Sequence, residues 1–149
     1  MTVDVKTEIV IARPRAQVAA FAANPDNAPA WYVNIKSAEW KSGSKVAVGA
    51  RVAFVAHFLG RRMAYTYEFV EYVPNERLVM RTAEGPFPME TTYTWETVGR
   101  DSTLMRLRNF GEPAGFSKLV APFMALAMRR ANSKDLARLK ARLEGQGSF

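Results

Sequence analysis

The sequence predicts an α+β domain in which a curved antiparallel sheet of six to seven strands wraps around one long C-terminal helix. Apolar or aromatic side chains recur at every second position in a series of segments, as in strands with one buried face. These segments are residues 3–12, 35–41, 51–59, 63–73, 78–82, 89–98 and 103–109. Short turns separate the later segments, which favours antiparallel pairing. The only long helical pattern covers residues 122–143.

One or two short helices are expected between the first two strands. Pro14 lacks an amide hydrogen that a first helical turn would leave unpaired, so it suits the start of a helix over residues 15–23. Asn24-Pro25 ends this helix, and a second helical turn is expected over residues 26–31. So few helices can cover only one face of the sheet. We therefore expect a cavity between that face and the C-terminal helix.

The alternation and the helical spacing predict which side chains face this cavity. In the last two strands Met89, Tyr93 and Trp95 share one face, as do Met105 and Leu107. On the C-terminal helix, residues three or four apart form one face consisting of Ala125, Met128, Asn132, Leu136, Leu139 and Leu143. A short lead-in from residue 116, a kink or restart at Pro122, and a frayed tail over residues 145–149 are expected.

Length and composition indicate one globular domain over residues 1–149, with 48% apolar and 23% charged residues. The chain has no cysteine, which excludes disulfides, thiolate metal sites and cysteine nucleophiles. No run approaches the roughly 18 apolar residues of a membrane span. The first residues alternate polar and apolar side chains, unlike a signal peptide. We therefore expect a cytoplasmic protein.

The net charge of +7 is concentrated near the C-terminus. Residues 115–144 hold seven basic side chains against two acidic ones, Asp135 and Glu144, and so account for +5. This charge is either a solvated helix face or a surface that docks to anionic partners such as lipid headgroups. No recognition element for DNA accompanies the charge, so nucleic acid is not expected as a partner.

Candidates for acid–base chemistry are few. His57 is the only histidine, and its position opposite Phe54 and Phe58 in the strand directs it outward, so a multi-histidine metal site is not expected. Glu71 has the parity of Tyr67 and Phe69, which directs it inward, where burial would raise the pKa of its carboxyl and suit it to acid–base catalysis. The alternative is that a bulge before Pro74 turns Glu71 outward.

Several segments, in order and at suitable spacing, resemble the START-like (SRPBCC) superfamily, which includes the polyketide cyclase/dehydratase proteins. They are an opening strand before Pro14, Gly49 ahead of a strand, Gly60 at a hairpin, residues 71–78 (EYVPNERL) and the helical end at residues 135–144 (DLARLKARLE). The resemblance covers nearly the whole chain. It implies the helix-grip fold, and it leaves open whether the protein carries a ligand or catalyses a reaction.

The first hypothesis is therefore a protein that binds a hydrophobic, lipid-like or aromatic small molecule, without a metal or cofactor. The alternatives are a cyclase/dehydratase-like enzyme using tyrosines or Glu71, and a module that docks through its basic helix with weak anionic membrane contact. Oligomeric state is left open. The predicted ligand-binding residues are Trp31, Phe54, Phe58, Tyr65, Tyr67, Met80, Met89, Tyr93, Trp95, Met105, Phe123, Met128 and Asn132.

Overall fold

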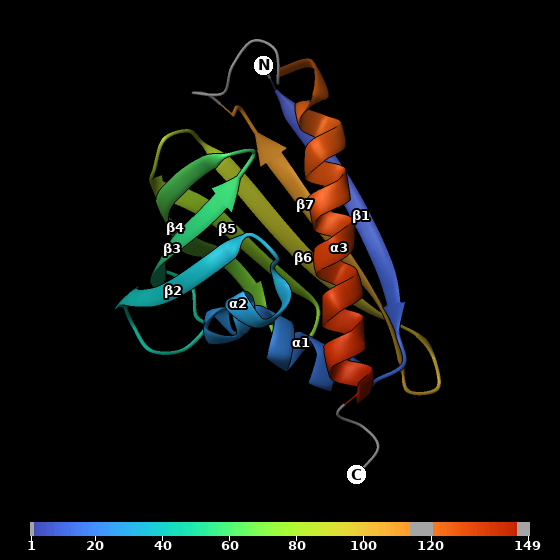
Figure 1. The fold of residues 1–149 in the computed structure, drawn as a ribbon. Helices are drawn as coiled ribbons and strands as arrows, with labels where there is room; N and C mark the ends of the chain where they lie inside the picture. Colours follow the sequence, from blue (N-terminus) through green and yellow to red (C-terminus); the bar gives the residue numbers. More distant parts are fainter. Residues whose placement is uncertain (1, 114–120, 146–149) are drawn as a thin grey trace.

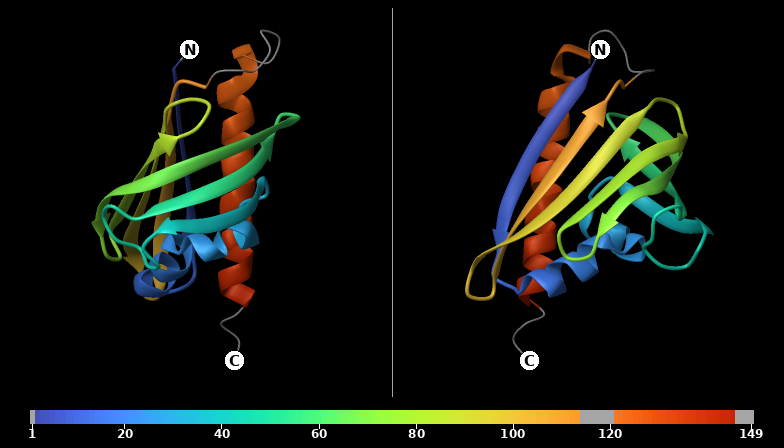
Figure 2. Two further views of the ribbon diagram at one scale, coloured as in Figure 1. Left: turned by 90° about the vertical axis from the view of Figure 1, so that its left-hand side faces the viewer. Right: turned by 180° about the vertical axis from the view of Figure 1, so that it is seen from behind.

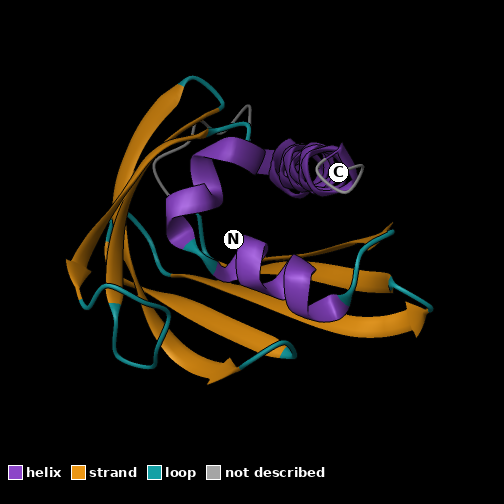
Figure 3. Ribbon diagram, turned by 90° about the horizontal axis from the view of Figure 1, so that it is seen from below, coloured by secondary structure: helices purple, strands orange, loops and turns teal. Residues whose placement is uncertain are grey.

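The computed structural model describes residues 2–113 and 121–145, and it confirms the predicted α+β architecture. Seven strands form one antiparallel sheet in the order β1-β7-β6-β5-β4-β3-β2, which curves around the helices (Figure 1, Figure 3). The strands are β1 (Val3–Ile11), β2 (Ile35–Ser42), β3 (Arg51–Phe58), β4 (Arg61–Val73), β5 (Arg77–Glu84), β6 (Met89–Gly99) and β7 (Ser102–Gly111). The predicted lead-in over residues 116–120 and the tail over residues 146–149 lie outside the described residues.

The helices all lie on the concave side of the sheet. The long helix α3 (Met124–Gly145) packs along β1, and the short helices α1 (Arg15–Ala23) and α2 (Ala28–Trp31) cross the end of the sheet where β1 finishes (Figure 2). A 3-10 turn, Ala121–Phe123, precedes α3, so the helix restarts just after Pro122 as expected. None of the helices in the described parts of the chain is long and apolar enough to cross a membrane.

The hairpin between β3 and β4 turns within two residues, because Phe58 pairs with Arg61. Both turn residues have positive φ, 50° at Leu59 and 75° at Gly60. This is the backbone of a tight turn whose twist matches that of the strands, and glycine adopts it without strain. Gly60 therefore sets the register that places Phe54 opposite Tyr65 on the cavity face.

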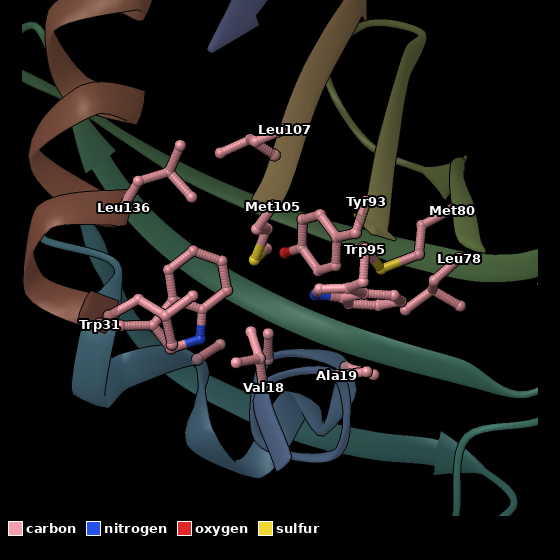
Figure 4. Packing of buried hydrophobic residues seen from close by; sticks show 14 of the residues in the cluster. Val18, Ala19, Trp31, Leu78, Met80, Tyr93, Trp95, Met105, Leu107 and Leu136 are labelled. Carbon is pink, nitrogen blue, oxygen red and sulfur yellow. The ribbon is translucent and has the colours of Figure 1, made fainter. Parts of the chain in front are cut away.

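The core lies between the concave face and the helices, and the predicted strand parity is confirmed except at the end of β4. Phe69, Met105 and Leu107 are fully buried, and Tyr93 and Trp95 pack beside them (Figure 4). On α3 the buried positions are Met124, Met128, Asn132, Asp135, Leu136, Leu139 and Leu143. The prediction that Ala125 belongs to this face was wrong, because the helix starts with Met124 turned inward and Ala125 is exposed.

The two ends of α3 are attached to the sheet differently. At its C-terminal end the Glu144 carboxylate accepts hydrogen bonds from the Ala12 amide, at 2.8 Å, and from Lys140. Arg13 donates to the carbonyl oxygens of Leu143, at 3.1 Å, and of Glu144. At the other end Met124 and Met128 pack with Val3 and Val5 in a small apolar cluster that is separate from the main core.

Candidate functional site

A cavity of about 150 Å³ lies between the concave face of the sheet and the first half of α3. Its wall is mostly apolar and includes five methionines, Met63, Met80, Met89, Met124 and Met128. Methionine side chains are flexible and fill irregular space, so this wall can adapt to different shapes. The β5–β6 loop contributes Pro86 and Phe87 to the wall.

Polar groups on the wall are joined in two short networks. The hydroxyls of Tyr32 and Tyr93 lie 2.6 Å apart. The Tyr67 hydroxyl lies 2.9 Å from the Thr91 hydroxyl, which in turn donates to Asn109 Oδ1 at 2.6 Å. These bonds satisfy groups that would otherwise be buried without partners, and they fix the orientation of three tyrosine rings.

Burial keeps these tyrosines in the neutral, hydrogen-donating form. It raises the pKa of Tyr67 to about 12, and it also raises the pKa of Tyr93, Tyr32 and Tyr65 well above the usual value of a tyrosine. Within the described residues, the Tyr65 hydroxyl has no hydrogen-bond partner. It is therefore available to donate to, or accept from, a molecule in the cavity.

Two residues of α3 place strongly polar groups in the same wall. Asp135 is 2% exposed, and its Oδ1 accepts the Val33 amide at 2.8 Å. Burial raises the pKa of Asp135 to about 6, against the opposing effects of the Val33 amide and the positive charge of Arg138. Asn132, three residues earlier and 5% exposed, has a buried Nδ2 without a partner in the described chain.

Two other buried donors also have no partner among residues 2–113 and 121–145. They are the indole Nε1 groups of Trp31 and Trp95, which lie in the core and not on the cavity wall. Asn132 Nδ2 is therefore the unpartnered buried donor that faces the cavity.

The structure places nine of the thirteen predicted ligand-binding residues on the cavity wall. They are Phe54, Phe58, Tyr65, Tyr67, Met80, Met89, Tyr93, Met128 and Asn132. That they bind a ligand stays a prediction.

The other four are elsewhere. Trp31, at the end of α2, is buried in the core, and so are Trp95 and Met105 on the sheet, because α1 and α2 cover that end of the concave face (Figure 4). Phe123 is 63% exposed, since the inward position at the start of α3 is taken by Met124.

The inward orientation predicted for Glu71 was wrong. The register of β4 against β5 shifts between Phe69 and Glu71, and this bulge reverses the parity of the strand end. Glu71 therefore faces solvent and pairs with Arg77 at 3.1 Å, while Tyr72 packs against the core. His57 is exposed, as its parity predicted.

Sequence reasoning missed Asp135 and Tyr32 as cavity residues. Asp135 was counted with the surface charge of the last helix, although it lies three residues after Asn132 and four before Leu139, on the apolar stripe. That position was a readable signal. For Tyr32 there was no such signal. Because α2 is a single turn, no periodic pattern in the sequence shows which of Trp31 and Tyr32 faces the cavity.

Because the Asp135 side chain points inward, its negative charge does not offset the basic side chains on the outer face of α3. Arg129, Arg130, Lys134, Arg138 and Arg142 are all exposed. Leu126 in the first turn of α3 and Phe123 in the 3-10 turn before it are also exposed.

Comparison with known families identifies the class to which this cavity belongs. The family described as "Polyketide cyclase / dehydrase and lipid transport" matches residues 2–144, so the chain belongs to this family. Comparison with proteins of curated function gives no match.

Several solved structures have a similar fold. The protein TTHA0849 of Thermus thermophilus has a TM-score of 0.83 at 21% identity, covering 97% of this chain and 99% of its own. A START superfamily protein from Mycobacterium smegmatis has a TM-score of 0.81 at 14% identity, covering 95% and 97%. The Zhui aromatase/cyclase from a Streptomyces species also has a TM-score of 0.81 at 14% identity, covering 97% and 94%. These identities show a shared fold alone.

Proposed function

We propose that this protein binds a small hydrophobic molecule that carries a polar group, in the cavity between the sheet and α3. The observation that carries the proposal is the combination of an apolar, methionine-rich wall with a buried amide donor, Asn132 Nδ2, that has no partner in the described chain. A buried unpartnered donor costs about 1–3 kcal/mol, which a ligand acceptor offsets when it binds. Pockets of this composition are typical small-molecule sites.

The volume supports a compact ligand. A cavity of about 150 Å³ in a protein core holds a molecule the size of benzene. We therefore expect one ring or a short branched chain to fit without rearrangement, and larger molecules to need movement of the wall.

The test fills the cavity without disturbing the sheet. Ala56 lines the cavity on β3, and Ala53 on the same strand faces outward. Ala56→Leu is expected to abolish uptake of 2-phenylethanol measured by titration calorimetry, while the matched variant Ala53→Leu binds it as the wild type does. Equal affinity in all three proteins, with both variants folded by circular dichroism, would show that the cavity is not the binding site.

An enzymatic role is the second candidate, because Asp135 and Tyr65 provide a titratable acid and a free hydroxyl on one wall. A carboxyl with a pKa near neutrality is suited to proton transfer. We expect a linear poly-β-ketone to be converted to a cyclised or dehydrated product, detected by mass spectrometry, and Asp135→Asn to slow the conversion. Absence of conversion by the wild type would remove this candidate and leave binding intact.

Weak contact with anionic membranes is the third candidate, and it is supported by the basic outer face of α3 beside exposed Phe123 and Leu126. Each basic side chain near such a surface contributes about 1 kcal/mol, screened by salt. Flotation with phosphatidylserine vesicles should decrease at high salt and in the double variant Arg129→Gln/Arg130→Gln. The charge-matched control Lys45→Gln/Arg100→Gln, on two exposed loops, should float as the wild type does.

A further inference from the structure

The charge of the cavity wall selects among hydrophobic ligands. Of the described residues that line the cavity, Asp135 is the only carboxylate, and none is lysine, arginine or histidine. The positive charge of Arg138 lowers the pKa of Asp135, but Arg138 is exposed, is not part of the wall, and donates to the Ala30 carbonyl at 3.3 Å. At neutral pH the described wall therefore presents one negative charge and no positive charge to a bound molecule.

Asp135 is positioned to accept a hydrogen bond from that molecule. One carboxylate oxygen, Oδ1, holds the Val33 amide, and Oδ2 has no hydrogen bond to any residue in the described part of the chain. Asn132 lies three residues earlier on α3, so the two side chains are neighbours on one helix face. Together they present an acceptor, Asp135 Oδ2, beside a donor, Asn132 Nδ2, whose lack of a partner is a separate sign of a missing ligand group.

The tyrosines around Asp135 add to the same preference. Tyr32, Tyr65 and Tyr93 line the cavity, and the Asp135 charge contributes to raising the pKa of each of their hydroxyls. Neutral phenol rings present negative π-faces, which attract cations and repel anions. No described group on the wall carries a positive charge that would balance a ligand carboxylate.

We propose that the ligand of this cavity is a single-ring or similarly sized hydrophobic molecule with a hydrogen-donating head, an amine or a hydroxyl, that donates to Asp135 Oδ2, and that carboxylate-bearing molecules such as free fatty acids are excluded. A hydroxyl head can also accept a hydrogen bond from Asn132 Nδ2. The inference rests on the proposed binding function and names the ligand class for the same site. Selectivity follows because a buried anion brought beside Asp135 would be unpaired, whereas an amine or hydroxyl supplies the donor that Oδ2 lacks.

Four molecules of nearly equal shape test the head group alone. They are 2-phenylethylamine, 2-phenylethanol, ethylbenzene and phenylacetate, titrated into the protein at pH 7.5 by calorimetry. We expect the amine and the alcohol to bind most tightly, ethylbenzene roughly 5- to 100-fold more weakly than the alcohol, and phenylacetate at least about 100-fold more weakly than the amine.

The variant Asp135→Asn keeps the shape and removes the charge. It should weaken binding of the amine by at least about tenfold and strengthen binding of phenylacetate, with ethylbenzene nearly unchanged. Asp4→Asn, an exposed carboxylate on β1, is the matched control and should leave all four affinities unchanged.

The outcomes separate the two claims. Binding of ethylbenzene and phenylacetate as tight as that of the amine and the alcohol would overturn the selectivity and leave the binding function in place. A ranking that Asp135→Asn does not change would equally overturn the role of Asp135. Failure of all four molecules to bind the wild type would overturn both the ligand class and the binding function at this size.

Discussion

Replacement of Asp135 by asparagine is expected to stabilise the protein at neutral and alkaline pH. The carboxylate is 2% exposed, and burial raises its pKa from 3.8 to about 6. Because its pKa is higher in the folded than in the unfolded state, the folded protein binds this proton more tightly. The resulting stability is fully present below about pH 4 and is lost as the pH rises through about 6.

The magnitude follows from the size of the shift. A difference of about 2 pKa units lowers the free energy of unfolding above pH 7 by about 3 kcal/mol relative to a neutral side chain. Asparagine keeps an acceptor for the Val33 amide and carries no charge. Asp135→Asn should therefore raise the free energy of unfolding by up to this amount. Such a gain corresponds to a rise in Tm of roughly 6–12 °C for a chain of this length.

Thermal melts followed by circular dichroism between pH 4 and pH 8 would measure the effect. The difference in Tm between variant and wild type should be small at pH 4 and grow to its full size above pH 7. Asp4→Asn is the control of opposite sign: Arg108 holds that exposed carboxylate at 2.8 Å and lowers its pKa, so its contribution is lost as the pH falls. A destabilised Asp135→Asn variant at pH 8, or a gain equal at pH 4 and pH 8, would refute the reasoning.

Three further substitutions probe the rest of the structure. Tyr67→Phe removes the hydroxyl that bonds Thr91 and should lower the free energy of unfolding by about 1 kcal/mol, measured by urea denaturation. Leu59→Asn, in a turn position with φ of 50° before Gly60, should stabilise by about 1 kcal/mol; a loss of stability would contradict the turn geometry. Glu71→Gln breaks only a half-exposed surface pair, so it should change stability by less than about 1 kcal/mol and leave the affinity for 2-phenylethanol as it was.

The fold could be predicted because its signals are periodic. Alternation in β3, β4 and β6 specifies one face of the sheet, and the glycine of the β3–β4 turn specifies the hairpin. The same signals place Phe54, Tyr65 and Tyr67 on the cavity wall, because a strand of regular pleat directs every second residue to one side.

The errors arose where regularity ends. A single extra residue before Glu71 reverses the strand parity, and no local composition marks that bulge. Trp31 and Trp95 were wrongly assigned to the cavity wall. An aromatic residue suits both a cavity wall and a packed core, and the sequence does not show which end of the concave face is filled by α1 and α2. Asp135 was missed for a different reason: its charge was taken as a sign of exposure, although its helical position indicated burial.

Because the two ends of α3 are attached differently, the helix could rotate about its C-terminal end. Its C-terminal end is a pivot bonded to residues 12 and 13, while the contacts of its first turn, within the described residues, are apolar ones with Val3, Val5, Phe58 and Met89. For a rod of about 33 Å, a rotation of about 5° at the pivot moves the free end by about 3 Å. Such a rotation would widen the cavity for a larger guest by parting this apolar cluster, while the hydrogen bonds at the pivot would stay in place.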